Sequence, residues 1–109
     1  MKLVIAVVHD DDADELVEKL VEKKFRSTKL ASTGGFLKEG NTTLLMGIDE
    51  GKIDEVVDII KEVCKVRKQT YTTPIPPTGS AGVFIPYPID IVVGGATIFV
   101  VDVDRFEKV

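Results

Sequence analysis

Several residue types are scarce in this sequence, which has one cysteine, one histidine and no tryptophan among its 109 residues. The single Cys64 excludes an internal disulfide framework and any motif of paired cysteines, and it makes the cytoplasm the default location. The apolar run at residues 3–8 is far too short to span a membrane or to form the apolar region of a signal peptide. We therefore expect a cytoplasmic protein without membrane insertion.

Positive charge is also sparse, since 14 basic residues stand against 18 acidic ones and the net charge is −4. No basic block occurs, which argues against general nucleic-acid binding through phosphate neutralisation. The apolar content of 44% and the charged content of 29% are those of an ordinary globular protein. The length predicts one domain over residues 1–109. A domain of this size buries only about two-thirds of its unfolded surface, so association with other chains would help to stabilise it.

Catalytic patterns are missing as well, because the sequence contains no P-loop pattern and no nucleophile with a recognisable basic partner. Asp10, Asp11 and Asp12 form an acidic run, which is typical of a helix N-terminus, where the helix dipole favours negative charge. A metal site is the alternative interpretation, but no further cluster of ligands accompanies the run. We predict neither an enzyme nor a protein that holds a metal or a cofactor.

The first half of the chain predicts a strand followed by a helix. Residues 3–8, LVIAVV, are typical of a strand that is buried on both faces. Residues 12–24 carry apolar side chains at helical spacing, and the expected core stripe consists of Ala13, Leu16, Val17, Leu20 and Val21. A similar strand–helix unit recurs in TLLMGIDEGKIDEVVDII.

The second helix is predicted at residues 52–65, with Cys64 as a small buried member of its apolar stripe. Residues 66–87 are crowded with proline and glycine and predict a long, mostly irregular loop, although residues 66–73 are compatible with an extended segment. Loops of this length in compact domains are usually functional or disordered.

Two further strands are predicted at residues 89–93 and 97–103, joined by a tight turn or bulge at Gly94 and Gly95. The elements thus follow the order strand, helix, strand, strand, helix, strand, with one strand left over. This order predicts an α+β fold, a ferredoxin-like βαββαβ sandwich with an extra C-terminal strand and both helices on one face of an antiparallel sheet.

The first strand poses a problem for such a sandwich, because its alternate side chains are apolar on both faces of the sheet. The two helices can cover only one of these faces, and the chain is too short for a third layer. Burial of the second face against other subunits is the simplest solution.

A glycine-rich segment connects two strand-like runs at residues 25–32 and 41–47. This loop, residues 33–40, is longer than a plain hairpin needs and carries Phe36 and Leu37. The arginine, threonine, glycine and asparagine residues around it suit phosphate groups and an adenine edge, and Phe36 can stack on a base. The alternative is a hairpin in which Phe36 and Leu37 pack on their own domain.

Three stretches of the sequence resemble one family: FRSTKLASTGGFLKEGNTTLLMG at residues 25–47, IPYP at 85–88 and VGGATIFV at 93–100. They are similar to the PII-like cyclic di-AMP receptors of the PstA/DarA type, and the opening MKLVIAVVHDDDADELVEKL agrees with them. The resemblance covers nearly the whole chain and is weakest between residues 66 and 83. It implies a PII-like homotrimer with the sheets facing inward, a short loop at 33–40 and an enlarged loop at about 66–87.

The resemblance also implies cyclic di-AMP as the ligand, bound between neighbouring subunits at three sites per trimer. The implied ligand-binding residues are Arg26, Thr28, Gly35, Phe36, Leu37, Asn41, Gly47, Phe99 and Lys108. Arg26 and Thr28 would contact phosphate or base, and Phe36 and Leu37 would sandwich adenine. Asn41 would read the adenine edge, and Gly47 would leave space for the ring. Phe99 and the C-terminal tail would approach the same cleft.

Lys108 departs from the family pattern, which tends to have glutamine there. Lysine reaches a phosphate as a point charge but accepts no hydrogen bond.

These observations predict a small-molecule sensor that changes loop order on binding and signals to an unidentified protein partner. Two alternatives stay open at this point. One is a PII-type sensor of ATP or ADP, which shares the fold, and the other is a structural or regulatory trimer without a nucleotide ligand.

Overall fold

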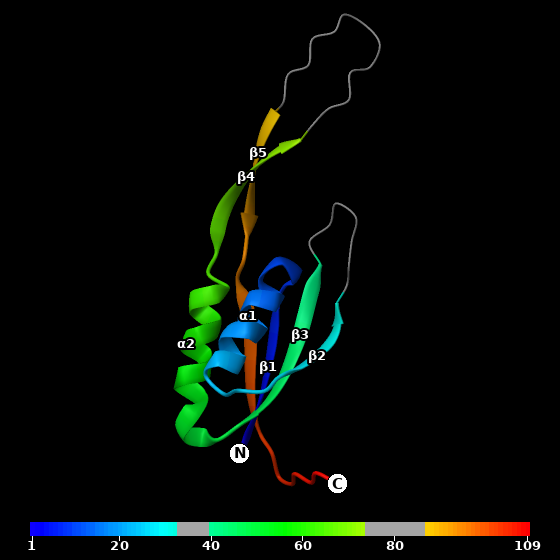
Figure 1. Cartoon of the computed structure of the whole chain (residues 1–109), viewed down its shortest axis with the longest axis vertical. Helices are drawn as coiled ribbons and strands as arrows, with labels where there is room; N and C mark the ends of the chain where they lie inside the picture. Colours follow the sequence, from blue (N-terminus) through cyan, green and yellow to red (C-terminus); the bar gives the residue numbers. More distant parts are fainter. Residues whose placement is uncertain (33–39, 74–86) are drawn as a thin grey trace, which may run out of the picture.

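The computed structural model describes residues 1–32, 40–73 and 87–109, and the elements below belong to these ranges. The elements follow the order β1 (Lys2–His9), α1 (Asp10–Glu22), β2 (Thr28–Ser32), β3 (Asn41–Ile48), the short 3-10 helix η1 (Glu50–Lys52), α2 (Ile53–Val63), β4 (Arg67–Thr73), β5 (Tyr87–Val93) and β6 (Ala96–Asp102) (Figure 1). The central loop at 33–39 and the Pro/Gly-rich segment at 74–86 lie outside the described residues.

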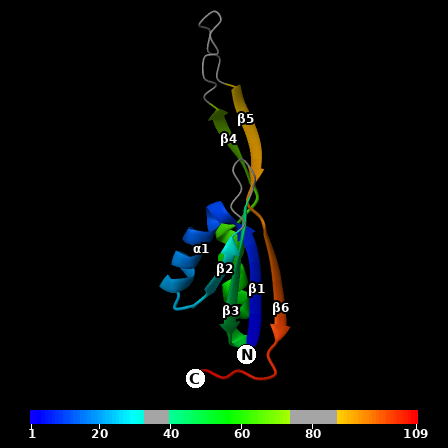
Figure 2. The ribbon, with the colours of Figure 1, turned by 90° about the vertical axis from the view of Figure 1, so that its right-hand side faces the viewer.

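Four strands form one antiparallel sheet in the order β2-β3-β1-β6, and both helices lie on the same side of it (Figure 2). The prediction of an α+β fold with two helices on an antiparallel sheet is confirmed. The predicted extra C-terminal strand is wrong, however. β6 is the fourth strand of the main sheet and pairs with β1, whereas β4 and β5 form a separate two-stranded sheet inserted before it.

The helices begin and end close to the predicted residues. α1 starts at Asp10 rather than Asp12, so all three acidic residues of its run lie in the first turn, where they face the positive end of the helix dipole. Ala13, Leu16 and Leu20 are buried as expected, but Val21 is 60% exposed because it falls on the outer side of the helix. The prediction that Cys64 is a buried apolar residue is confirmed, since it is 2% exposed.

The hydrophobic core lies between the helices and one face of the sheet. Its members are at most 3% exposed, and they are Val4, Ala6, Val8, Ala13, Leu16, Leu20, Leu44, Met46, Ile48, Val56, Ile60 and Cys64. The sheet residues among them are the even-numbered positions of β1 and β3, as the two-residue period of a strand requires.

The opposite sheet face, which we call the open face, is formed by the odd-numbered positions of β1 and β3 and their neighbours. Ile5 pairs with Leu45 on one side and with Phe99 on the other, and Leu3 pairs with Val101. Phe99 and Val101 are 53% and 43% exposed. Both helices lie on the other side of the sheet (Figure 2), so the described part of the chain leaves this apolar face without a covering layer. The expectation that β1 is apolar on both faces is therefore confirmed.

The β4–β5 ribbon extends beyond the end of the main sheet (Figures 1 and 2). Its register runs from Arg67 opposite Val93 to Thr73 opposite Tyr87. The extended segment that the sequence allowed at residues 66–73 is confirmed by β4, whereas β5 begins at Tyr87, two residues before the strand predicted at 89–93. The sequence of β4, RKQTYTT, is rich in β-branched and aromatic residues, and its pairing with β5 satisfies backbone hydrogen-bonding groups of both strands.

Candidate functional site

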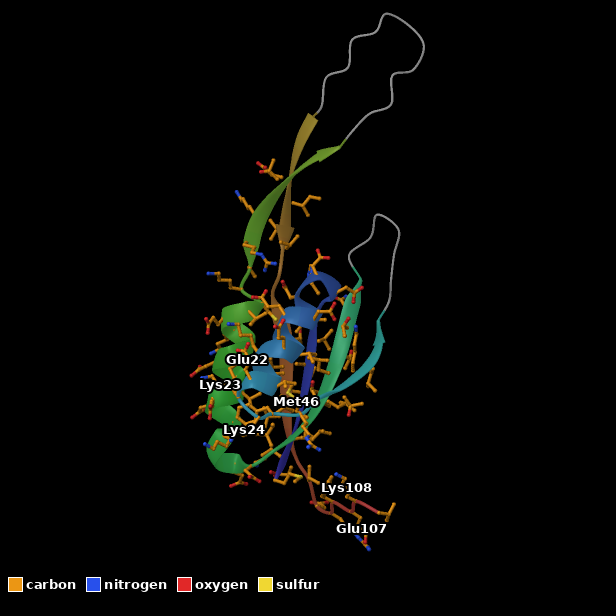
Figure 3. The ribbon with its side chains drawn as sticks, viewed as in Figure 1. Glu22, Lys23, Lys24, Met46, Glu107 and Lys108 are labelled. Carbon is orange, nitrogen blue, oxygen red and sulfur yellow. The ribbon has the colours of Figure 1, made fainter. Side chains whose placement is uncertain are left out.

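A cleft of about 510 Å³ lies between the start of β2, the end of β3 and the C-terminal tail; we call it the tail cleft. It is lined by Met1, Arg26, Ser27, Thr28, Leu45, Gly47, Phe106, Glu107 and Lys108. Four of the residues that sequence reasoning selected therefore meet in one place, although up to 82 positions separate them (108 − 26). Figure 3 shows Glu107 and Lys108 on the tail, beyond the end of the sheet.

The tail cleft combines positive charge with apolar surface. Arg26 and Lys108 supply two cations, and the Thr28 hydroxyl supplies a hydrogen-bonding group beside them. Glu107 is the one carboxylate among the lining residues, and its Oε1 accepts a hydrogen bond of 2.6 Å from Nη2 of Arg105, so its charge is partly balanced. Leu45 and Phe106 add apolar surface. An anion that carries a flat ring suits such a lining.

Backbone and ion-pair contacts fix the tail at this cleft. The amide of Val103 donates to the carbonyl oxygen of Met1, at 3.4 Å. Nζ of Lys2 pairs with Asp102 at the end of β6 and lies 3.6 Å from Oε1 of Glu50. The hydrogen bond with Asp102 raises the pKa of Lys2 and lowers that of Asp102. The tail therefore leaves β6 from a tethered point.

Gly47 contributes to the tail cleft in a different way from the one predicted. A Cβ atom at this position would lie 3.4 Å from Sδ of Met1. The space above Gly47, which was expected to receive a ligand ring, holds the Met1 side chain in this structure.

Asn41 lies at the opposite end of β3, in a second hollow of about 300 Å³ that we call the turn pocket. Its lining residues are Val7, His9, Asn41, Gly94, Gly95, Ala96 and Thr97. Asn41 pairs with His9 across the β1–β3 ladder, and six residues separate it from Gly47. At the rise of a strand this separation is about 20 Å, so Asn41 and the tail cleft are far apart within one chain.

The remaining predicted residues fall in neither hollow. Phe99 lies on the open face, two strands away from Leu45, and lines neither the tail cleft nor the turn pocket. Gly35, Phe36 and Leu37 lie outside the described residues. Val7 and Leu45 occupy the same face as Phe99, so both hollows border the open face at its two ends.

Comparison with known proteins identifies the family. The family model described as "Cyclic-di-AMP receptor" matches residues 1–109. The chain belongs to the cyclic-di-AMP receptor family. A crystal structure of a functionally unknown protein from Pediococcus pentosaceus ATCC 25745 is also similar, with 44% identity and a TM-score of 0.76 over 99% of this chain and 96% of that one.

Three further properties of the described residues complete the chemical picture. Burial raises the pKa of the Cys64 thiol to about 12, so it is protonated and a poor nucleophile at neutral pH. Residues 1–32, 40–73 and 87–109 contain no group of three His, Cys, Asp or Glu that could hold a metal ion. Among the same residues, no helix is both long and apolar enough to cross a membrane.

Sequence reasoning missed several lining residues of this receptor. Met1, Leu45 and Phe106 line the tail cleft, and His9 and Thr97 line the turn pocket. Of these, only Phe106 carried a usable signal, because the family resemblance implied that the C-terminal tail approaches the ligand cleft. Gly94 and Gly95, where the sequence predicted a tight turn or bulge, also line the turn pocket.

Proposed function

We propose that this receptor binds cyclic di-AMP between neighbouring subunits of a homotrimer and reports binding to a partner protein through a change in loop order. Family membership supports the ligand class. The observation that carries the proposal is the split of the implied ligand-binding residues between the tail cleft and the turn pocket, at opposite ends of the open face.

Arg26 and Asn41 of the same chain are about 20 Å apart along β3, so a single ligand would have to extend along most of this strand to contact both. Two chains remove this difficulty if the tail cleft of one subunit faces the turn pocket of its neighbour. Such a contact joins different surfaces of the two chains, and a contact of this type closes into a ring when the rotation fits.

The open face supports association. Apolar side chains of β1, β3 and β6 follow one another across this face, and Phe99 and Val101 on the edge strand β6 are about half exposed. Contiguous apolar surface of this kind is costly in water and marks interaction sites. In the proposed trimer the three open faces turn inward, and each subunit brings its Phe99 close to a neighbour's binding site.

In the proposed site, Arg26 and Lys108 bind the phosphates and Asn41 reads the adenine edge. Phe36 and Leu37, which the family resemblance implies, sandwich an adenine ring. Lysine in place of glutamine at position 108 keeps a charge contact with phosphate but loses an acceptor. The receptor works in the cytoplasm, where the single Cys64 stays reduced.

Titration calorimetry tests the ligand. We expect one cyclic di-AMP per subunit and weaker binding of cyclic di-GMP and ATP. Arg26→Ala and Asn41→Ala should each weaken cyclic di-AMP at least about tenfold, since a lost polar contact costs roughly 1–3 kcal/mol. Lys61→Ala removes a charge from α2, away from both hollows, and should bind as wild type does. Tighter binding of ATP than of cyclic di-AMP would assign the chain to PII-type energy sensors instead.

Subunit mixing tests the split site. Neither Arg26→Ala nor Asn41→Ala alone should form a complete site. A trimer assembled from both variants, however, can join an intact tail cleft of one chain to an intact turn pocket of its neighbour. Unfolding and refolding an equal mixture should restore tight binding at about a quarter of the sites, because one in four random neighbour pairs has the correct order. If Arg26 and Asn41 of the same chain served one site, mixing would restore nothing.

A further inference from the structure

The first turn of α1 contacts Gly40 and Thr42, the residues on either side of the start of β3. The amide of Asp10 donates to the carbonyl oxygen of Gly40, at 3.0 Å. The hydroxyl of Thr42, which is 1% exposed, donates to Oδ1 of Asp10. Asp10 therefore fixes the start of β3 on either side of Asn41, one of the implied ligand-binding residues.

The same turn also holds the base of the β4–β5 ribbon. Asp12 is only 2% exposed, and its Oδ1 lies 2.6 Å from Nη2 of Arg67 while its Oδ2 lies 3.4 Å from Nη1. Nη1 of Arg67 also donates to the carbonyl oxygen of Lys65, at 3.1 Å. The guanidinium thus makes a two-point contact with a buried carboxylate, which compensates the cost of burying that charge.

Arg67 is in close contact with the turn that enters β6. Gly94 has a φ of +92°, and a Cβ atom there would overlap the carbonyl oxygen of Lys65 and lie 3.0 Å from Nη1 of Arg67. The amide of Gly95 donates to the carbonyl oxygen of Cys64. Only glycine fits this close approach, so the Gly94–Gly95 turn packs directly against the guanidinium group of Arg67.

Among the described residues, the ribbon makes few other contacts with the body of the protein. Its main contacts are those between β4 and β5 themselves, and it extends beyond the main sheet (Figure 1). An isolated two-stranded ribbon is only marginally stable in water. Its position relative to the body therefore depends on the contacts at residues 64–67 and 93–95.

We propose that Asp12 and Arg67 are positioning residues for ligand binding: their ion pair holds the Gly94–Gly95 wall of the turn pocket, and with it the base of the ribbon, against the first turn of α1. Because Asp10 in the same turn fixes the start of β3, this turn connects Asn41 to the ribbon. The effect on ligand affinity rests on the proposed function, whereas the effect on the ribbon does not.

Hydrogen exchange of the ligand-free protein tests the structural part. Asp12→Asn keeps the shape of the side chain but removes the charge that Arg67 binds. We expect amide exchange to become at least about tenfold faster in β4, β5 and Gly95, with little change in the core strands β1 and β3. Asp14→Asn is the matched control, because Asp14 is an exposed residue of the same helix whose partner Lys29 lies 3.7 Å away. Equal exchange in the ribbons of the two variants would overturn the proposal.

Calorimetry with cyclic di-AMP tests the link to binding. We expect Asp12→Asn to weaken binding about tenfold well below its melting temperature, where a loss of stability alone would leave affinity unchanged. Arg67→Lys keeps the charge but loses the two-point contact and should fall between wild type and Asp12→Asn. Faster ribbon exchange with wild-type affinity in both variants would overturn the positioning role. If wild type itself binds no cyclic di-AMP, the proposed function fails, and the exchange experiment still decides whether the ion pair holds the ribbon.

Discussion

The two faces of the main sheet contain similar residues in very different surroundings. Leu44 and Leu45 are neighbours on β3, yet Leu44 is fully buried beneath the helices whereas Leu45 lies on the open face and lines the tail cleft. In β1, Val4, Ala6 and Val8 are buried, whereas the odd-numbered residues are only partly buried. Among the residues that the structure describes, the helices cover one face of the sheet and leave the other apolar face without a covering layer.

This difference separates two sources of stability. Burial of apolar area at about 25 cal/mol per Å² contributes to the stability of the single chain only on the helix face. The same residue types on the open face contribute once other chains cover them. We therefore expect substitutions on the two faces to affect different quantities, namely chain stability and subunit association.

The largest effect is expected from a charge at the centre of the open face. Wild type should scatter light as three times the chain mass of 11.9 kDa, and Ile5→Lys should scatter as a monomer. Ile5 lies between Leu45 and Phe99. An unpaired ammonium group buried there would cost roughly several kcal/mol per interface. Val21→Lys adds the same charge at a site that is 60% exposed on α1 and should leave the mass unchanged. A trimeric Ile5→Lys protein would contradict the assignment of this face.

The neighbouring leucines give the next largest contrast. In the monomeric Ile5→Lys background, Leu44→Ala should lower the free energy of unfolding by about 2–5 kcal/mol, because it leaves a cavity in the core. Leu45→Ala in the same background should cost less than about 1 kcal/mol, since Leu45 is only partly buried there and water can fill the space that the side chain leaves. Urea denaturation of the two proteins measures both values. Similar losses at the two positions would mean that the chain covers both faces.

A smaller effect is expected from the pH dependence of the helix face. Cys64 has a folded-state pKa of about 12 against an ordinary 9.0, chiefly because burial disfavours the thiolate. Folding therefore favours the protonated thiol. The contribution of the thiol to the free energy of unfolding is complete below about pH 9 and is lost as the pH rises toward 12. The free energy of unfolding should fall by up to about 1.4 kcal/mol per pH unit in that window.

Cys64→Ala supplies the control for this titration, because it retains every other group that titrates above pH 9. Denaturation of both proteins at pH 8 and pH 10 isolates the thiol as the difference between their pH dependences. Equal pH dependence would mean that water reaches the thiol and that this part of the core is less dry than its exposure indicates.

Much of this protein could be predicted from local sequence. The strand at residues 3–8, the two amphipathic helices and the burial of Cys64 follow from periodicity, because each depends on residues within a few positions of one another. The two-faced apolar pattern of β1 also indicated, without any structure, that one sheet face lacks cover. The motif at residues 25–47 indicated the receptor family, which the family model over residues 1–109 confirms.

Other features depend on contacts between distant segments, and only the tertiary structure decided them. The pairing of β6 with β1 and of β4 with β5 joins residues whose sequences are equally compatible with other partners. The placement of Arg26, Gly47 and Lys108 in one cleft, with Asn41 at the far end of the same strand, follows from sheet register and from where the tail is tethered. The Asp12–Arg67 ion pair spans 55 positions and has no local signature. Local patterns specify which elements form, but the choice among long-range pairings is made by collective packing of the whole chain.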